Sequence, residues 1–481
     1  MTDTAAPPRP EVPAEDAPTP MTRWLWLVGA VILTAGVLFG YDQGVISGAL
    51  DGIDKSFSIT TLMTEIITSW VTLGALVGAL VAGVVADRIG RRPAIMLAAG
   101  LFVAGAVVEA AAPGAWVLVV GRLVVGFGVG VASVAAPLYA AEMAPTRIRG
   151  RFVSGYQFGI TFGIFVAYLV DEFLQSGDAW RLMLGLSAVP GVLLLLLILP
   201  STDSPRWYLK AGRSDDARRA LARLHPDGTD EAMHELESSV AGDAPEAAWR
   251  EVFARRWRKP LVIGIGLAVF QQITGINAII YYADRIFAAA GFSTPAQQTA
   301  ATTWAIGGVN VLATLIAIAF VDKLGRKPLL LAGLVGMAVS LTVVGISFLS
   351  LGDVTSTTTS TGHASDAGAV TLVALVVYII SFAFSLGPVV WTVINEIFPR
   401  DVRGRGVAVA TAFNWGTAWL VSQFFLTLVD TLGESGTFWL FASFCVLAYV
   451  WIWRGVPETK GRSLEEIEAM FAEDHAATAA S

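Results

Sequence analysis

The sequence is poor in the residues that build disulfides, metal sites and catalytic centres. Of its 481 residues, one is a cysteine, Cys445, and four are histidines. A single cysteine excludes a disulfide framework and a metal site with cysteine ligands. The histidines all lie outside the long apolar runs, which argues against a buried histidine relay or metal cluster. We therefore expect no metal and no cofactor.

Charged residues are scarce as well. They make up 15% of the chain, whereas a soluble domain has about 25%. The net charge of −7 offers no basic footprint for nucleic acid, so a nucleic-acid partner is excluded. The chain also lacks a Gly-x-x-x-x-Gly-Lys-[Ser/Thr] loop for nucleotide phosphates. ATP-driven transport by this chain alone and enzymatic activity are therefore not expected.

Long apolar runs dominate what is present. Apolar residues make up 55% of the chain, and a helix needs about 20 of them to cross a bilayer. The runs fall into two groups of six, near residues 24–46, 66–86, 93–112, 115–138, 152–172 and 181–200, then 259–283, 299–321, 328–350, 370–394, 404–428 and 436–454. We predict an all-α membrane protein with twelve transmembrane helices.

The distribution of lysine and arginine predicts how the chain is oriented in the membrane. Of the 32 such residues, 28 fall on the side of the predicted membrane that carries both chain ends. The other side receives Lys55, Arg181 and Arg285, and Arg122 lies inside the fourth run. Because positive loops stay in the cytoplasm, both termini are expected there, in a multi-pass protein of the plasma membrane.

The same runs divide the chain into five parts. We expect a disordered cytoplasmic tail at 1–22, bundles of six helices at 23–200 and 258–456, a cytoplasmic helical linker at 201–257, and a cytoplasmic helix with a tail at 457–481. The linker carries the apolar spacing of short amphipathic helices. A capping box of Ser463 and Glu466 predicts the start of the last helix.

The two groups of six repeat each other. Asp-Arg-Ile-Gly-Arg-Arg at 87–92 follows the second run, and Asp-Lys-Leu-Gly-Arg-Lys at 322–327 follows the eighth. A Glu and an Arg seven residues apart follow both the fourth and the tenth run. A duplicated unit with its site between the halves is typical of transporters.

Seven motifs, spread over residues 24–471, make the resemblance specific. They are FGYDQGVISG (39–48), DRIGRR (87–92), GR (121–122), QQITGIN (271–277), DKLGRK (322–327), GPVVW (387–391) and PETKGR (457–462). On these motifs the sequence resembles the sugar porter family of the major facilitator superfamily. The resemblance implies the major facilitator fold, with two pseudo-symmetric six-helix bundles and short cytoplasmic helices. One motif departs from the family: its PESPR reads Thr202-Asp-Ser-Pro-Arg206 here.

Polar residues within the apolar runs are candidates for a sugar site, because amides both donate and accept hydrogen bonds. The family's sugar-binding positions correspond to Gln157, Gln271, Gln272, Asn277 and Asn414, and more loosely to Asn310. The alternative is that these amides tie helices together. For Gln271 and Gln272 we favour the site, because Gly275 allows their helix to bend. Trp391, after a predicted break at Gly387-Pro388, and Trp415 offer flat rings to a sugar.

Asp42 and Arg122 lie deep in the first and fourth runs. An unpaired charge there costs at least about 2.5–3.5 kcal/mol, so we expect the two to form an ion pair. It is either a static pair or a proton carrier, and the family's proton-coupled members resemble this Asp pattern.

The repeated charges predict a gate. In the family such a network closes the cytoplasmic side, and the alternative is that the charges only set topology. The candidate gate residues are Asp87, Arg88, Arg91, Arg92, Glu142, Arg149, Arg206, Asp322, Arg326, Glu396, Arg403 and Glu458. Gly126-Phe-Gly-Val-Gly130 superficially matches a dinucleotide loop, but its position in mid-span predicts close helix packing instead.

Taken with the resemblance, these features predict a monomeric proton:sugar symporter that imports a hexose, pentose or related polyol by alternating access. The alternatives are a uniporter for a sugar or polyol and a membrane sugar sensor that does not transport.

Overall fold

The structure is a computed structural model. It describes residues 21–145, 148–175, 179–226, 228–241, 249–354, 366–398, 402–460, 466 and 470, and within these ranges the side chains of 249, 321–323 and 351–354 are not described.

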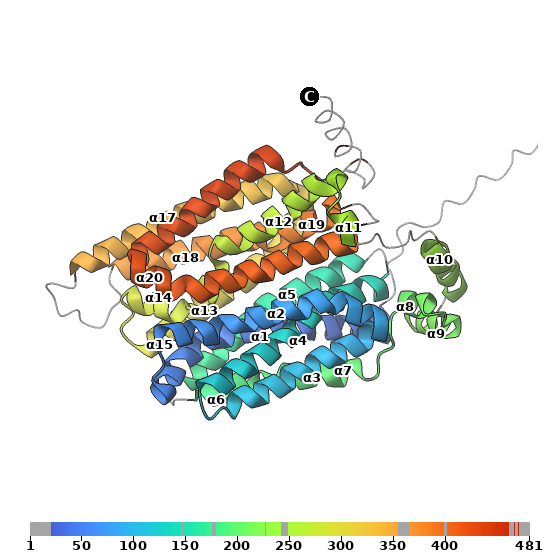
Figure 1. The fold of residues 1–481 in the computed structure, drawn as a ribbon, viewed down its shortest axis with the longest axis horizontal. Coiled ribbons are helices and arrows are strands. Elements are labelled where there is room, and N and C mark those ends of the chain that lie inside the picture. The colour runs from blue at the N-terminus through green and yellow to red at the C-terminus, as the bar shows by residue number, and fades with distance from the viewer. Residues whose placement is uncertain are drawn as a thin grey trace, which may run out of the picture.

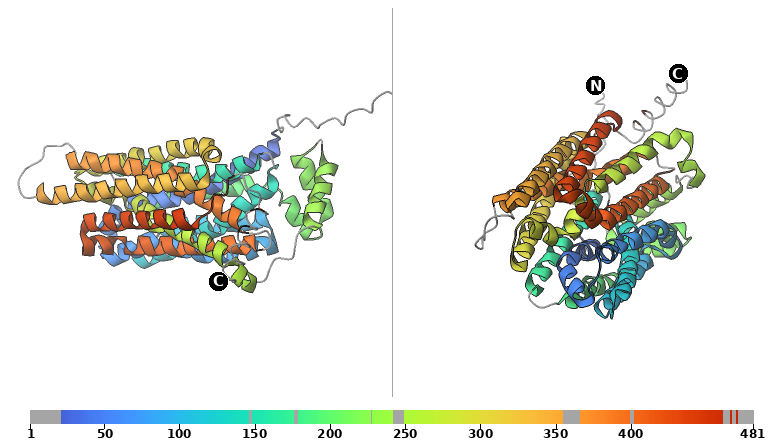
Figure 2. Two further views of the ribbon diagram at one scale, coloured as in Figure 1. Left: turned by 90° about the horizontal axis from the view of Figure 1, so that it is seen from above. Right: turned by 60° about the vertical axis from the view of Figure 1, so that its left-hand side comes forward.

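Two helical halves lie side by side, as Figures 1 and 2 show. The first half consists of α1 (Arg23–Phe57), α2 (Thr61–Ile89), α3 (Arg91–Ala110), α4 (Ala115–Met143), α5 (Arg149–Leu174), α6 (Trp180–Leu186) and α7 (Ala188–Ile198). The second consists of α12 (Arg258–Ile273), α13 (Ile276–Tyr281), α14 (Ala283–Ala289), α15 (Pro295–Ala301), the π-helix η2 (Thr302–Gly308), α16 (Val309–Leu324), α17 (Arg326–Val354), α18 (Asp366–Phe384), α19 (Leu386–Ile397) and α20 (Arg403–Gly455).

In the described part of the chain, 11 helical stretches are long and apolar enough to cross a membrane. The longest, α20, contains two predicted spans joined at Gly433, whose φ of 71° and ψ of 167° are not helical. This agrees with twelve spans in an all-α membrane protein. The first helix runs on to Phe57, well past the predicted apolar run 24–46.

Two predicted helix breaks are present in the second half. Gly275 separates α12 from α13 with a φ of +98°, in the left-handed region that favours glycine. Ser385 separates α18 from α19. Pro388 follows in the first turn of α19, where a missing backbone N–H costs little. The second break therefore lies just before the predicted Gly387-Pro388.

Short helices between the halves gather at one end of the bundle, which we call the linker end; the opposite end is the far end (Figure 1). They are α8 (Pro205–Lys210), α9 (Ser214–Leu224), α10 (Thr229–Ala241), α11 (Trp249–Val252) and the 3-10 turn η1 (Arg255–Trp257). Ala217 and Leu221 of α9 pack against Met233 of α10, which confirms the predicted amphipathic helices. The predicted last helix, beginning at Ser463, lies outside the described residues.

Glycines pack the first half backbone against backbone. In α1, a Cβ added to Gly40 would lie 1.9 Å from the carbonyl oxygen of Ile160 in α5. In α4, a Cβ on Gly126 would lie 2.0 Å from the carbonyl oxygen of Val71 in α2. These contacts confirm that the glycines at 126–130 serve helix packing.

Polar contacts between the halves lie from the middle of the bundle to the far end. Gln423 of α20 accepts hydrogen bonds from Ser69 Oγ at 2.8 Å and from Trp70 Nε1 at 3.2 Å. Glu65 accepts two more, from Thr427 N at 2.7 Å and from Thr427 Oγ1 at 3.0 Å. Between described residues, no comparable hydrogen bond joins the halves at the linker end. In this conformation, hydrogen bonds hold the two halves together at the far end.

Candidate substrate site and membrane charge pair

Four of the predicted amides form one network in the second half. Asn414 Nδ2 donates to Gln271 Oε1 at 2.7 Å, and Gln272 Nε2 donates to Asn414 Oδ1 at 3.2 Å. Asn277 Nδ2 donates to Gln272 Oε1 at 2.9 Å. The break at Gly275 makes this possible, because it turns α13 so that Asn277 points back at the end of α12.

The other two predicted amides make no hydrogen bond with any described residue. Gln157 lies on α5 of the first half and is partly exposed, while Asn310 lies on α16 of the second half and is 6% exposed. Each therefore has its full donor and acceptor capacity available. Together with the network they present amides from both halves.

The two predicted tryptophans differ in their surroundings. Trp415 is 6% exposed and packs against Phe39 of the first half, with ring centroids 5.3 Å apart. It also borders a small void that Asp42 and Tyr281 line from the two halves. Trp391 lies on α19 and is partly buried.

The predicted ion pair is present. Arg122 donates to Asp42 Oδ1 at 2.6 Å, and the two residues are 0% and 2% exposed. A third member, Glu109 of α3, was not predicted from the sequence. It is 1% exposed, and its Oε1 lies 3.8 Å from the same guanidinium. One buried arginine can balance the charge of only one of the two carboxyl groups.

A polar contact across the halves lies between this charge cluster and the amide network. Gln43, next to Asp42, donates through Nε2 to Tyr281 Oη across the halves at 3.3 Å. Tyr281 lies one helical turn after Asn277 on α13. Neither Gln43 nor Tyr281 was predicted, although Gln43 belongs to the first motif. This contact therefore places α1, which carries Asp42, against α13, which carries Asn277.

The predicted gate residues of the first half form a cluster at the linker end. Arg91 binds Glu142 at 2.9 Å and Asp87 at 2.9 Å. Arg92 donates to the carbonyl oxygens of residues 198 and 199. Arg88 and Arg149 are exposed and make no ion pair with a described residue.

Equivalent residues of the second half repeat this arrangement. Arg326 binds Glu396 at 3.2 Å, and Thr459 donates to the same carboxylate at 2.6 Å. Arg403 donates through Nε to the carbonyl oxygen of Phe398. The side chain of Asp322 lies outside the described residues. Glu142 and Glu396 therefore bind Arg91 and Arg326, not the arginines seven residues further along.

A carboxylate after the last span of each half binds the start of that half's third span. In the first half, Asp203 Oδ1 accepts from Arg91 N at 2.9 Å. In the second, Glu458 accepts from Arg326 N and Lys327 N, both at 3.0 Å. Burial raises the pKa of Asp203, and backbone N–H groups oppose this rise only in part. Burial acts the same way on Glu458, but its backbone donors outweigh it, so the pKa of Glu458 lies below its usual value. Arg206, after Asp203, donates to Ser239 of α10.

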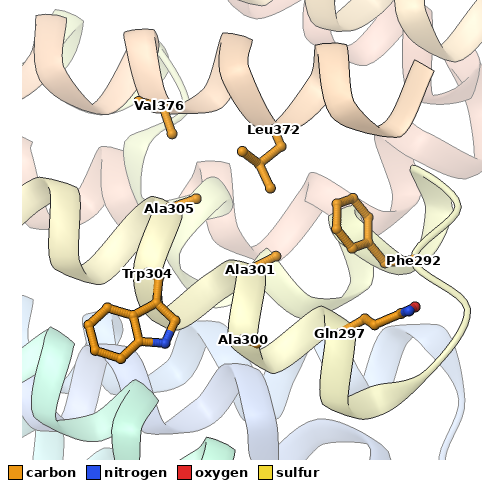
Figure 3. A pocket seen from close by; sticks show the side chains of 8 residues that line it. All are labelled: Phe292, Gln297, Ala300, Ala301, Trp304, Ala305, Leu372 and Val376. Atoms are coloured by element: carbon orange, nitrogen blue, oxygen red, sulfur yellow. The ribbon is translucent and has the colours of Figure 1, made fainter. Parts of the chain in front are cut away.

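A cavity of about 520 Å³ lies elsewhere, between α15, η2 and α18 (Figure 3). Apolar side chains surround it, and Gln297 and the indole nitrogen of Trp304 are the polar groups on its wall. None of the predicted site residues lines it. It is therefore not the candidate substrate site.

Comparisons with known proteins agree with this architecture. Residues 28–471 match the sequence model of the family described as "Sugar (and other) transporter". The galactose-proton symporter of Escherichia coli (strain K12) is 41% identical over 438 residues, covering 90% of this chain and 91% of that protein. A D-xylose transporter of Levilactobacillus brevis is 37% identical and covers 93% and 95%. The inward open structure of the xylose transporter XylE from E. coli superposes with a TM-score of 0.78 at 31% identity, covering 92% and 99%.

Proposed function

The chain belongs to the sugar transporter family, and we propose that it imports a monosaccharide together with a proton by alternating access. Its relatives include proteins named for galactose, xylose, glucose and arabinose. The substrate is accordingly a hexose, a pentose or a related polyol. The protein lies in the plasma membrane as a monomer, with both termini and the linker end in the cytoplasm.

Sugar hydroxyls bind the amides between the halves. Gln157 and Asn310 meet the sugar directly, because nothing in the described chain occupies their amides. Gln271, Gln272, Asn277 and Asn414 exchange hydrogen bonds among themselves for bonds to the sugar. Trp391 and Trp415 pack against the apolar C–H face of the sugar ring.

Proton coupling uses Asp42. The observation that carries the proposal is the buried Asp42–Arg122 pair, beside which Gln43 bonds Tyr281 on α13, the helix that also carries Asn277. Protonation neutralises Asp42 and releases Arg122 toward Glu109. The hydrogen bond from Gln43 of α1 to Tyr281 of α13 then changes together with the charge on Asp42.

The conformation fits the inward-facing stage of such a cycle. Hydrogen bonds join the halves at the far end, which faces the outside, and the ion pairs between described residues at the linker end lie within one half or the other. Closing the cytoplasmic side brings these clusters together, and this is the proposed role of the gate residues.

The test is uptake of radiolabelled galactose and xylose into proteoliposomes containing Asp42→Asn. The expected result is that accumulation driven by a pH gradient or by voltage is lost, because no group carries the proton. Exchange of labelled for unlabelled sugar persists, because it needs only the loaded carrier. One proton crossing 100 mV supplies about 2.3 kcal/mol, which corresponds to roughly 50-fold accumulation.

Asp54→Asn is the matched control, because Asp54 lies on the same helix and is exposed. It should accumulate sugar like the parent. If Asp42→Asn still concentrates sugar against its gradient, coupling through this residue is wrong and the protein is a uniporter. If exchange and accumulation fall together in proportion to lost folded protein, the pair is static.

A further inference from the structure

Asp171, near the far end of α5, is a buried carboxyl group that the proposed cycle does not use. The residue is 2% exposed. Its Oδ2 accepts a hydrogen bond from the backbone N–H of Gly48 in α1 at 3.2 Å, and its Oδ1 is buried without a partner. The contact is tight, since a Cβ on Gly48 would lie 2.5 Å from Asp171 Cβ.

A second carboxyl group faces it from the other half. Asp284 of α14 accepts from Thr302 of η2, and its backbone N–H donates to Ser47 Oγ at 3.1 Å. Ser47 and Gly48 are adjacent, so one short segment of α1 touches both acidic residues. The two carboxyl groups also interact electrostatically.

Among described residues, the groups that act on Asp171 electrostatically carry no positive charge. These groups are Asp284 from α14, Tyr41 from α1 and Tyr168 from its own helix. The buried Oε2 of the neighbouring Glu172 has no partner either.

The nearby cations, which lie on α6 and α14, face other groups. Arg181 of α6 stacks on Trp180 and donates to the carbonyl oxygen of Ala112. Arg285 acts on Tyr282, and Asp51 of α1 adds a further negative charge near Asp284. An ionised Asp171 in this place would be desolvated and uncompensated.

The position of the pair ties it to closure of the far end. Around it, Thr303 Oγ1 donates to the carbonyl oxygen of Tyr168, and Tyr168 Oη donates to that of Ile280. Both bonds join α5 of the first half to the second. If the halves separate at this end, water reaches the acidic groups and both can ionise.

We propose that Asp171, facing Asp284 across the halves, is a second proton-binding site, and that the far end closes when Asp171 takes up a proton. The site is separate from Asp42, because Gly48 lies six residues, about 9 Å of helix rise, further toward the far end. Closure therefore becomes more favourable as the pH falls. One proton changes the ratio of closed to open molecules by at most tenfold per pH unit.

The test measures the width of the far end as a function of pH. Spin labels go on cysteines at Leu62 and Ala296, exposed residues of the two halves, in a Cys445→Ala background. Their distance distribution is recorded by pulsed electron paramagnetic resonance in lipid nanodiscs without sugar, from pH 5 to 8.5. In the parent, the share of long distances should rise with pH.

Two variants test the assignment. Asp171→Asn should weaken the pH response and keep the far end closed at high pH, because asparagine cannot ionise. Asp284→Asn should reduce the pH response and leave more molecules closed at high pH, because it removes the repulsion between the two carboxylates. Some response should remain, because closure still desolvates Asp171. Asp54→Asn, at an exposed position of the same helix α1, should keep the response.

An unchanged pH response in Asp171→Asn would overturn the proposal. If that variant does not fold, an unchanged response in Asp284→Asn would overturn it equally. The inference rests on the proposed alternating access, but its measurement uses no sugar. The distance measurement can therefore contradict a second proton site while sugar uptake supports the proposed symport, and the opposite pair of results is equally distinguishable.

Discussion

Amide side chains in the middle of the bundle are of two kinds, and this difference is testable. Gln157 and Asn310 have no hydrogen-bond partner among described residues, so replacing either with alanine removes only bonds to sugar. Sugar binding should weaken about 2–10-fold, as one lost hydrogen bond of about 0.5–1.5 kcal/mol implies, with no change in the melting temperature. Gln272→Ala should lower both the sugar affinity and the melting temperature. It removes the hydrogen-bond partner of Asn277 Nδ2 and of Asn414 Oδ1, and an unsatisfied buried group costs about 1–3 kcal/mol.

Calorimetric titration with galactose and xylose and thermal unfolding of the purified variants measure the two effects. Gln175→Ala serves as the control, because Gln175 follows the far end of α5. Should Gln157→Ala leave affinity unchanged and lower the melting temperature, this amide would serve helix packing instead.

For single residues, the sequence predicts well which charged groups pair but poorly how deeply a charged group is buried. Pairing of Asp42 with Arg122 follows from the cost of a lone charge in a bilayer, and the structure confirms it. Glu109 and Asp171 were missed because each lies near the end of an apolar run, where a charge usually marks the boundary. Only the packing of neighbouring helices shows that both are buried. The sugar-binding roles of the amides stay predictions.

Among the helices, the ends of α3 and α17 show how the duplication is used. Each begins with an arginine whose backbone N–H binds a carboxylate that follows the last span of the same half. Each arginine side chain then binds the glutamate at the end of that half's fourth span. The repeat therefore fixes the linker-end termini within each half.

Arg149, at the start of α5, tests whether the linker-end charges also form a gate. Its side chain makes no ion pair with a described residue in this conformation, so Arg149→Ala costs little here. If Arg149 joins a network when the linker end closes, its loss destabilises only the closed form. At about 0.2–1 kcal/mol for an exposed pair, the share of molecules with an open linker end should rise up to about fivefold.

Spin labels at Ile89 and Leu324, exposed linker-end residues of the two halves, report this change. Arg151→Ala is the matched control, because Arg151 is also exposed and lies two residues along the same helix. Equal distance distributions in both variants would contradict the gate, and Arg149 would then only help to set the orientation of the chain in the membrane.

Helix positions follow from apolar runs, but helix lengths do not. The first run predicts 24–46, whereas α1 continues to Phe57 through a segment that contains two aspartates, Asp51 and Asp54, and one lysine. Hydropathy reports how far a chain can cross a membrane, while backbone hydrogen bonding decides how far a helix extends. The breaks at Gly275 and Ser385 were predictable to within two or three residues, because glycine and proline act locally.

Polar contacts join the two halves at the far end, and these should set the conformational equilibrium. Glu65→Ala removes two hydrogen bonds from Thr427. Bonds to a charged group contribute about 1.5–3 kcal/mol each, so molecules with an open far end should increase at least tenfold. The labels at Leu62 and Ala296 measure this, with Glu434→Ala, an exposed glutamate of α20, as the control.

An unchanged far-end distance in Glu65→Ala would mean that apolar packing alone holds this end closed. The sequence predicts two similar halves but not which end is closed, because one sequence must stabilise both conformations. The duplicated motifs indicate a symmetric molecule, whereas the polar contacts that distinguish its two ends come from unrepeated residues such as Glu65 and Gln423.

The glycine contacts of the first half bear on how energy is transmitted. Where Gly40 meets Ile160 and Gly126 meets Val71, backbone rests on backbone, and no side chain can change rotamer to absorb a movement. In the second half, Trp451 lies over Gly266 and Trp439 over Gly345, so side chains mediate these contacts. Asp42 on α1 and Arg122 on α4 each belong to a stiff pair of helices, α1 with α5 and α4 with α2. The affinity of Asp42 for a proton is then altered by movement of one pair against the other and by the arrival or departure of water, not by bending within a pair.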